Sequence, residues 1–470
     1  MGPAPIGVVG KSTKDADVKD IVITRSFRAY EPNQLLLLPP DLREWVPEGH
    51  LAHFVSDLVD EGLDLSAIWR AYADGGRAHP AYHPAMMTKV LIYAYCTGVY
   101  SSRRIEKRLY EDVAFRYLAA QQSPDHKTIA EFRRRHLEAL KGLFQQVLEL
   151  CAEAGLVMLG HVALDGSKVA ANASKHSAMS YGRMVQEEAR LQKESEALLD
   201  RAERTDTAED ERYGDERGDE LPKELRFRQG RLAKIREAKA ALEQQARDKA
   251  AAKAKAEDPQ GGDKPPRPEG GGGEPETVKP EDTSQRNFTD PDSRVMLDGN
   301  KTWVQAYNAQ LAVDASSQVI VATEVTNQSA DGGHLPAMVG QIAQRTGLLP
   351  NELSADAGYA WEQNLAHLQG QSIDPYMATR RFKHHELAED VPPPPKTPLR
   401  KAMHDKLEQP EGRERYKLRK QTVEPVFGQI KEARGFRRFL LRGAEKVRGE
   451  WTLVCTAHNL CKLWAATMAG

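Results

Sequence analysis

An acid, a glycine and a lysine recur at helical spacing in the segment QTVEPVFGQIKEARGFRR, residues 421–438. Apolar residues at the same spacing predict that this segment is a helix with one face on a core. Glu424, Gly428 and Lys431 stand at i, i+4 and i+7, so they share one surface of the helix. This surface offers a carboxylate, a position without a side chain, and a cation. It is compatible with a solvated helix face, and also with a helix laid against a metal ion and a phosphodiester.

Two further carboxylates could join Glu424. Asp165 lies within the predicted strand HVALDGSKVAANAS (161–174), and Asp356 ends a short predicted strand in LSADAGYA. Divalent cations such as Mg²⁺ prefer oxygen ligands, and two ions about 3.5–4 Å apart can activate a water and stabilise a leaving 3′ oxygen. Each acid alone has an ordinary explanation: a turn at Asp165, a helix N-cap at Asp356, and a charge in a first helical turn at Glu424. The combination of the three favours a metal-dependent site.

The charge of the chain is informative only locally. The 470 residues carry a net charge of −2 with 40% hydrophobic residues, which implies two or three domains and says nothing about nucleic acid. Residues 401–450 hold 14 Lys/Arg against 8 Asp/Glu, a net charge of +6, and residues 103–136 hold 9 against 5, a net charge of +4. Residues 205–220 hold 2 against 8, a net charge of −6. Basic segments able to attract phosphate are thus masked by an acidic one.

The cysteines and the apolar segments indicate a cytoplasmic protein without membrane contact. Four cysteines are too few for a disulfide framework, and none lies in a CxxC motif. We expect them to be core residues in a reducing compartment. No apolar run reaches the roughly 18 residues of a membrane span, and the first residues lack a signal-peptide pattern.

The hydrophobic periodicity divides the chain into segments. Residues 1–20 are predicted to be disordered, and residues 21–158 to form an all-helical domain, because strand signals are nearly absent there. Alternating strands and helices in residues 159–180 and 300–470 predict an α/β domain with a mixed sheet flanked by helices. Its clearest element is a hairpin over residues 303–327, around the turn DASSQ.

A charged insertion interrupts the α/β domain. Met184, Leu191 and Leu198 repeat every seven residues within residues 181–256, which predicts an antiparallel helical hairpin bent at an acidic stretch. Residues 257–299 are rich in Gly and Pro and are predicted to be a disordered, low-complexity linker. One alternative treats this whole insertion as a protein-interaction arm and the functional centre of the chain.

The all-helical domain contains a pattern like a helix-turn-helix. Two helices are predicted around a break at Gly98–Ser102, and another begins at Asp125 or Lys127. The alternative is a helical bundle whose basic residues are only solvated. The candidate DNA-binding residues of this domain are Arg103, Arg104, Lys127, Arg133, Arg134 and Arg135.

The sequence resembles the DDE transposases of bacterial insertion sequences. The motifs that carry the resemblance are LDGSKVAANAS, YNAQLAVD, SADAGY, VEPVFGQIKEARGFRR, KVRGEW and HNL. The resemblance covers most of the chain outside residues 1–20 and the charged insertion. It implies an RNase H-like catalytic domain with Asp165, Asp356 and Glu424 as its catalytic, metal-binding triad. It also implies an N-terminal helical region that recognises terminal inverted repeats.

The same resemblance implies the cofactor and the partners. We expect Mg²⁺ or Mn²⁺, two ions per active site, and double-stranded DNA, both the element ends and the target, bound by a homodimer. The protein would act in the bacterial cytoplasm, associated with the nucleoid. The residues expected to contact DNA near the acids are Lys168, Tyr416, Arg419, Lys431, Arg434, Arg437 and Arg438.

One departure from the family pattern concerns the final helix. Many relatives carry Tyr-x2-Arg-x3-Glu-x6-Lys. Lys431 fits this spacing after Glu424, but Tyr416 and Arg419 fall one residue early. One residue is about 100° around a helix, so both side chains are expected to turn away from the acids unless Pro425 resets the phase.

The leading hypothesis is a transposase that cuts the element ends and transfers the freed 3′-OH to target DNA. Two alternatives stay open at this point. One is a metal-dependent DNA nuclease without strand transfer, and the other is a non-catalytic DNA-binding derivative of such an enzyme.

Overall fold

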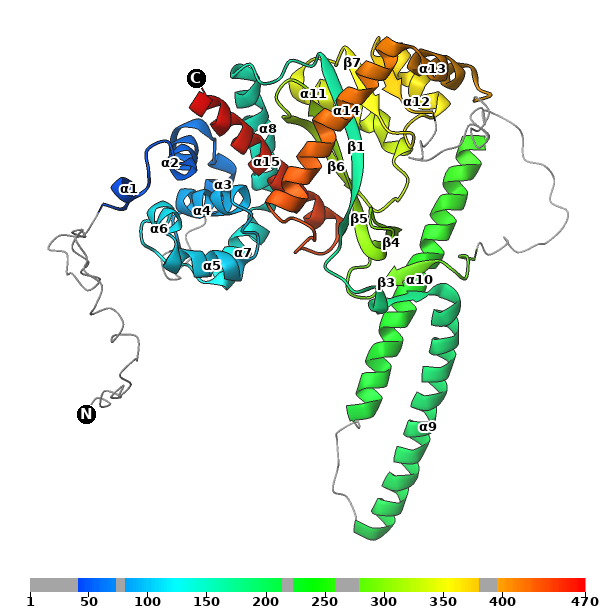
Figure 1. Cartoon of the computed structure of the whole chain (residues 1–470). Helices are drawn as coiled ribbons and strands as arrows, with labels where there is room; N and C mark the ends of the chain where they lie inside the picture. The colour runs from blue at the N-terminus through cyan, green and yellow to red at the C-terminus, as the bar shows by residue number, and fades with distance from the viewer. Residues whose placement is uncertain (1–40, 73–80, 214–222, 258–278, 380–394, 470) are drawn as a thin grey trace, which may run out of the picture.

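The chain folds into a helical part, a sheet with flanking helices, and a long helical hairpin that projects away from both (Figure 1). The structure, a computed structural model of the whole chain, describes residues 41–72, 81–213, 223–257, 279–379 and 395–469. The segment 1–20, predicted to be disordered, lies outside the described residues.

The helical part is built around one buried helix. α4 is covered by its neighbours on nearly all sides, since eleven of its thirteen residues are buried. α7 begins where predicted, because the Asp125 carboxylate accepts a hydrogen bond of 2.8 Å from the Thr128 N–H. The elements of this part are α1 (Leu42–Trp45), α2 (Leu51–Asp57), η1 (Leu58–Gly62), α3 (Ser66–Arg70), α4 (Pro84–Cys96), α5 (Ser102–Glu111), α6 (Val113–Leu118), α7 (His126–Arg135) and α8 (Leu137–Glu153).

A mixed sheet forms the centre of the second part, as predicted. β1 pairs antiparallel with β5 on one side and parallel with β7 on the other, and β7 continues in parallel to β8. β5 and β6 form the predicted hairpin, and β4 pairs with the first part of β5. The strands are β1 (His161–Ala170), β4 (Arg294–Leu297), β5 (Trp303–Asp314), β6 (Ile320–Thr326), β7 (Glu352–Ala355) and β8 (Asp374–Met377).

The flanking helices join the sheet to the helical part. α14 crosses the sheet in front of β1 and packs against β1 and β7 (Figure 1). α15 packs against β6, α8 and α4, so one continuous hydrophobic core runs through both parts. α11 ends at Gly347 with φ of 73°, as predicted. These helices are α11 (Leu335–Thr346), α12 (Glu362–Gly370), α13 (Pro398–Glu408), α14 (Pro410–Gly428), the π-helical turn η5 (Gln429–Ala433) and α15 (Ala444–Ala469).

Pro425 lies inside α14 without ending it. A proline has no N–H to donate to the carbonyl four residues earlier, which here is that of Gln421. The Gln318 side-chain amide donates to this carbonyl instead, at 3.0 Å. α14 therefore runs on to Gly428 without the change of phase that the sequence left open at Pro425.

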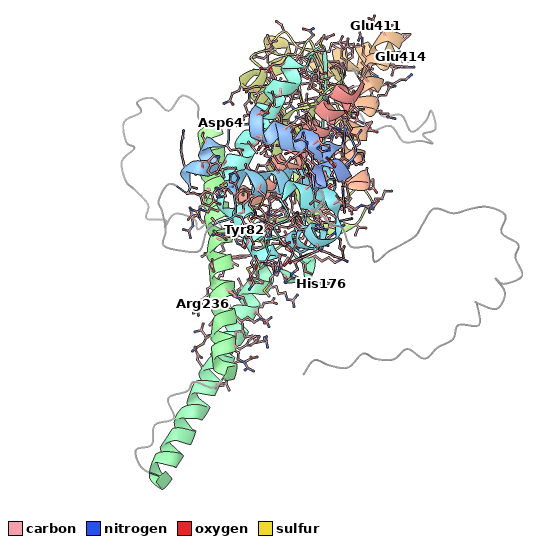
Figure 2. The ribbon with its side chains drawn as sticks, turned by 90° about the vertical axis from the view of Figure 1, so that its left-hand side faces the viewer. Asp64, Tyr82, His176, Arg236, Glu411 and Glu414 are labelled. Carbon is pink, nitrogen blue, oxygen red and sulfur yellow. The ribbon has the colours of Figure 1, made fainter. Side chains whose placement is uncertain are left out.

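The insertion is an antiparallel helical hairpin with its own small core, as its heptads predict. α9 (Tyr181–Tyr213) and α10 (Lys223–Glu257) bury Met184, Leu191 and Leu242 between them. Arg236 of α10 pairs with Glu188 of α9 at 2.9 Å, and Figure 2 shows Arg236 on the projecting hairpin. The connection 214–222 lies outside the described residues.

The last part of the predicted linker 257–299 is folded rather than disordered. Residues 258–278 lie outside the described residues, but β3 (Gln285–Asn287) pairs with β2 (Ala178–Ser180), and β4 joins the main sheet. Buried polar groups hold this region in place of apolar ones: Asn287 donates to the Ser174 carbonyl at 2.7 Å. Composition alone misses such a segment because its stability depends on partners elsewhere in the chain. No helix of the described residues is long and apolar enough to cross a bilayer.

Candidate active site

The central strands bring Asp165 and Asp356 together. β1 and β7 run parallel, and their last paired residues are Leu164 and Ala355. Asp165 and Asp356 are each the next residue, on adjacent strands that lie about 5 Å apart. Asp165 also remains paired on its other side with Leu311 of β5, which fixes its position in the sheet.

α14 adds Glu424 to the same place through an arginine. Arg419 donates from Nη1 to Asp165 Oδ2 at 3.0 Å and from Nη2 to Glu424 Oε1 at 2.8 Å. Its side chain is only 11% exposed, so this is a largely desolvated ion pair. Asp356 also acts on Arg419 electrostatically. The structure thus brings the three predicted acids around one guanidinium group.

The site holds more negative charge than Arg419 offsets. Burial raises the pKa of Asp165 to about 7, although Arg419 lowers it, and the charges of Asp356 and Asp331 raise it further. A buried carboxylate becomes easier to protonate when other carboxylates lie close by. Asp165 is therefore short of a positive partner at neutral pH.

Asp331 is a fourth acid of the site, and the sequence reasoning missed it. Its Oδ1 accepts hydrogen bonds from Lys168 at 3.1 Å, Asn308 at 2.6 Å and Gln310 at 2.9 Å. Gln310 in turn accepts from the buried Tyr359 hydroxyl. The only local signal was an acid before two glycines in SADGGH, which is too common to identify a site.

Two glycines allow the acids to approach each other. A Cβ at Gly166 would lie 2.2 Å from Gln310 Nε2 and 2.6 Å from Asp331 Oδ1. A Cβ at Gly358 would lie 3.0 Å from Asp356 Oδ1 and 3.7 Å from Asp331 Oδ2. Asp331 and Asp356 therefore face positions that have no side chain, and this keeps the space between the segments small.

The donor set fits a divalent cation in chemistry. Carboxylate oxygens are the ligands that Mg²⁺ prefers, and a bound cation would favour the ionised form of Asp165. Among the described residues, no three His, Cys, Asp or Glu side chains lie close enough to hold a metal ion in their present positions. The Arg419 guanidinium lies between Asp165 and Glu424, where it supplies the positive charge.

The orientation expected for Tyr416 and Arg419 is wrong. Arg419 binds two of the acids, and its Cζ lies 5.9 Å from the centre of the Tyr416 ring. Because α14 keeps its phase through Pro425, the length of the arginine side chain covers the angular offset from Glu424. Lys420, which stands where the family pattern has arginine, is exposed.

Lys168 and Lys431 are used inside the site rather than on its surface. Lys168 pairs with Asp331, and its side chain is largely covered. Lys431 Nζ donates to the Ser167 hydroxyl and, at 2.9 Å, to the carbonyl of Lys168. Burial lowers the pKa of Lys431. The lysine of the predicted surface stripe therefore fastens η5 to β1.

The three arginines after Lys431 have different surroundings. Arg434 donates to His458 Nδ1 of α15 at 2.7 Å, so it faces the core rather than a DNA surface. Arg437 is exposed and pairs with Glu432. Arg438 is exposed and, within the described part of the chain, has no ion-pair partner.

Arg133 is a structural residue, contrary to the prediction that it contacts DNA. It is buried and donates to the Tyr95 hydroxyl and to the Tyr100 carbonyl, each at 3.0 Å. The buried Glu450 of α15 also acts on it electrostatically. Three adjacent arginines on a helix must point in different directions, and the first points into the core.

The other candidates of the helical part remain on its surface. Arg103 and Arg104 on α5 and Lys127 on α7 are exposed. Arg134 is exposed but pairs with Glu131. Arg135 donates to the Ala71 carbonyl and covers the ring of Tyr72.

Comparison with protein families agrees with this arrangement. Residues 40–135, most of the helical part, match the model of a transposase domain (DUF772), and residues 391–464, which contain Glu424 and Arg419, match a transposase DDE domain. The two matches support an insertion-sequence DDE transposase. No curated protein and no solved structure gives a significant match.

The raised pKa of Asp165 predicts a pH-dependent cost to folding. The folded state holds this proton up to about pH 7 and the unfolded state only to about pH 4, so the contribution of Asp165 to stability falls as pH rises between these values. In EDTA, the stability of the wild-type protein relative to Asp165→Asn should fall by up to about 1.4 kcal/mol per pH unit over this window. Denaturant unfolding at several pH values measures it. A flat difference for Asp165→Asn would contradict the raised pKa.

The position of Arg419 predicts competition with a divalent cation. Arg419→Ala should destabilise the metal-free protein by about 1–3 kcal/mol, because it leaves the largely buried Asp165 carboxylate without its partner. Mn²⁺ should reduce this loss and bind more tightly to the variant than to the wild-type protein, as measured by calorimetry. Arg413→Ala removes an exposed α14 ion pair with Glu408 and should change neither quantity appreciably. Weaker Mn²⁺ binding to Arg419→Ala would show that Arg419 does not occupy the cation's place.

Proposed function

We propose that the chain is a transposase that binds the terminal inverted repeats of an insertion sequence, cleaves the DNA and transfers the strand. The main support is the convergence of Asp165, Asp356 and Glu424 from β1, β7 and α14. The transposase DDE match implies an RNase H-like fold, and the mixed sheet with flanking helices is compatible with it.

The acids and the basic residues take separate roles in this proposal. Asp165 and Asp356 would hold divalent metal ions, Mg²⁺ or Mn²⁺, and Glu424 would complete the site. Bound metal would activate the attacking water and stabilise the leaving 3′ oxygen. Asp331 holds Lys168 and the amides of Asn308 and Gln310 on β5 in place through hydrogen bonds. Arg419 has two possible partners, the carboxylates and a DNA phosphate, and the planar guanidinium can bind either with two hydrogen bonds.

The DNA-binding part of the proposal rests on the helical part. Arg103, Arg104 and Lys127 present their charges to solvent on α5 and α7, and we assign to this surface the recognition of the element ends. Two ends must be held together for transposition, so we propose that two copies of the chain act as a homodimer. The protein would work in the bacterial cytoplasm, associated with the nucleoid.

Asp356→Asn should abolish cleavage and leave DNA binding intact. The amide retains the oxygen that accepts the Gly358 N–H at 2.8 Å, so the loop should keep its shape. Cleavage of DNA that carries the inverted repeats flanking the gene should fall by roughly 10³-fold or more. Gel-shift affinity for the same DNA should stay within a factor of about two. Asp405→Asn, on the exposed surface of α13, serves as the control. Persistent cleavage by Asp356→Asn would show that Asp356 is not a catalytic residue.

Pre-cut ends separate the proposed transposase from a nuclease. With a free 3′-OH on the element end and a plasmid target, the wild-type protein should give strand-transfer products in Mg²⁺ or Mn²⁺. Clean hydrolysis without joined products would favour the nuclease, and binding without either reaction would favour the non-catalytic derivative.

The bare position at Gly428 predicts opposite effects on stability and on DNA binding. A Cβ at Gly428 would meet no atom within 4 Å, and the residue is helical, so Gly428→Ala should stabilise the free protein by about 0.5–1 kcal/mol. If the gap admits a DNA backbone beside Glu424, the same change should weaken binding of the inverted-repeat DNA by about fivefold or more. Thermal melting and gel shifts measure the two effects. Unchanged DNA affinity would leave Gly428 without a role in DNA contact.

A further inference from the structure

A second candidate site lies beyond the acids, at the far end of β1. There an open pocket of about 580 Å³ lies between the loop that follows β1, the start of β5 and the segment after η5. His176 lies where this region meets the base of the hairpin (Figure 2). We call this cavity the β1-end pocket, and its polar and aromatic lining includes Asn172, Lys175, His176, Trp303, Arg438 and Arg442.

The lining of the β1-end pocket is cationic. Lys175, Arg438 and Arg442 line it, and no Asp or Glu does. Within the described residues none of these three cations takes part in an ion pair, in contrast to Arg419 and Arg437. Arg442 donates from its Nε to the Asn172 carbonyl at 2.9 Å. A concave, unneutralised group of cations of this kind suits an anion such as phosphate.

An exposed tryptophan stands beside these cations. Trp303 is the first residue of β5 and is 60% exposed, although indole is among the most apolar side chains. Its backbone is held by pairing with Leu297 of β4, so the ring is presented from a strand rather than from a loop. Aromatic faces next to cations bind nucleobases and phosphates together.

The pocket is in line with the acids along β1. From Asp165 to Ala170 is five residues of strand, roughly 16 Å, and Ala170 is bridged to Arg438 at the pocket. Lys431, bound to Ser167, lies between them. This distance equals roughly five phosphates along one strand of B-form DNA.

We propose that the β1-end pocket binds a nucleotide of the DNA strand a few positions from the scissile phosphate. Trp303 stacks on its base, and Lys175, Arg438 and Arg442 bind its phosphates. The inference rests on the proposed function, because the strand would reach the pocket from the acids along β1.

Binding of short oligomers in EDTA tests the pocket without cleavage. The probes are a labelled ten-nucleotide oligothymidine and an abasic oligomer of the same length and charge, measured by fluorescence anisotropy with the full chain. The wild-type protein should prefer oligothymidine. Trp303→Ala should reduce this preference by roughly 5- to 100-fold, and Trp303→Phe should keep most of it. Trp45→Ala, which removes a similarly exposed tryptophan on α1, is the control.

The phosphate contacts have a separate readout. Arg438→Ala with Arg442→Ala should weaken both oligomers equally and reduce the slope of log affinity against log salt by about 1.4. Lys417→Ala, on the exposed face of α14, should not change the slope. Unchanged base preference in Trp303→Ala, or an unchanged slope in the double variant, would overturn the proposal.

Two further outcomes distinguish a mononucleotide site from a strand-binding site, and a wrong active site from a wrong pocket. If thymidine 5′-monophosphate displaced the oligomer at a concentration similar to that of the oligomer itself, the pocket would be a mononucleotide site and the strand proposal would be overturned. If Asp356→Asn still cut DNA while the oligomer results held, the proposed active site would fail and the pocket would stand.

Discussion

The ion pair between Asp165 and Arg419 connects the two elements on which the site depends. Asp165 is fixed in a strand that is paired on both sides, whereas Glu424 lies on a helix that crosses the sheet. One guanidinium binds both carboxylates, so it sets how α14 lies on β1. Burial makes Asp165 hard to ionise, and the charges of Asp356 and Asp331 in the same region add to this effect. The site is therefore held together by a cation and still has capacity for more positive charge.

Much of the architecture follows from local sequence patterns. The hairpin around DASSQ, the helix that ends at Gly347 and the heptads of the insertion each express a rule that acts within about twenty residues. The position of Asp356 is also readable, because an acid at the end of a buried strand lies at the carboxyl edge of a parallel sheet. Asp165 lies within β1 instead, and its sequence signal is an acid inside an apolar strand. Their proximity depends on the register in which β1 pairs with β7. This register cannot be read from any single segment of the sequence.

The remaining features depend on contacts between distant segments. Asp331 joins the site because Asn308 and Gln310 of β5 point at it, and Arg133 is buried because Tyr95 and Tyr100 accept its hydrogen bonds. From the sequence, all the candidate basic residues were predicted to contact DNA. The structure divides them into those that satisfy buried groups and those that face solvent with few partners, and only the second kind is available to a polyanion.

The helical hairpin also bears on how the sheet can form. β1 ends at Ala170, but its neighbours β4 and β5 begin only after residue 293, so their pairing must close a very long loop. α9 and α10 have their own hydrophobic core and cross-helix ion pairs, and the small β2–β3 pair draws together the two ends of the insertion. A helical hairpin that folds on its own in this way shortens the effective loop that the chain must close. If α9 and α10 pair early in folding, the sheet should assemble faster. The carboxylates of Asp165 and Asp356, which are far apart in the sequence, would then come together sooner.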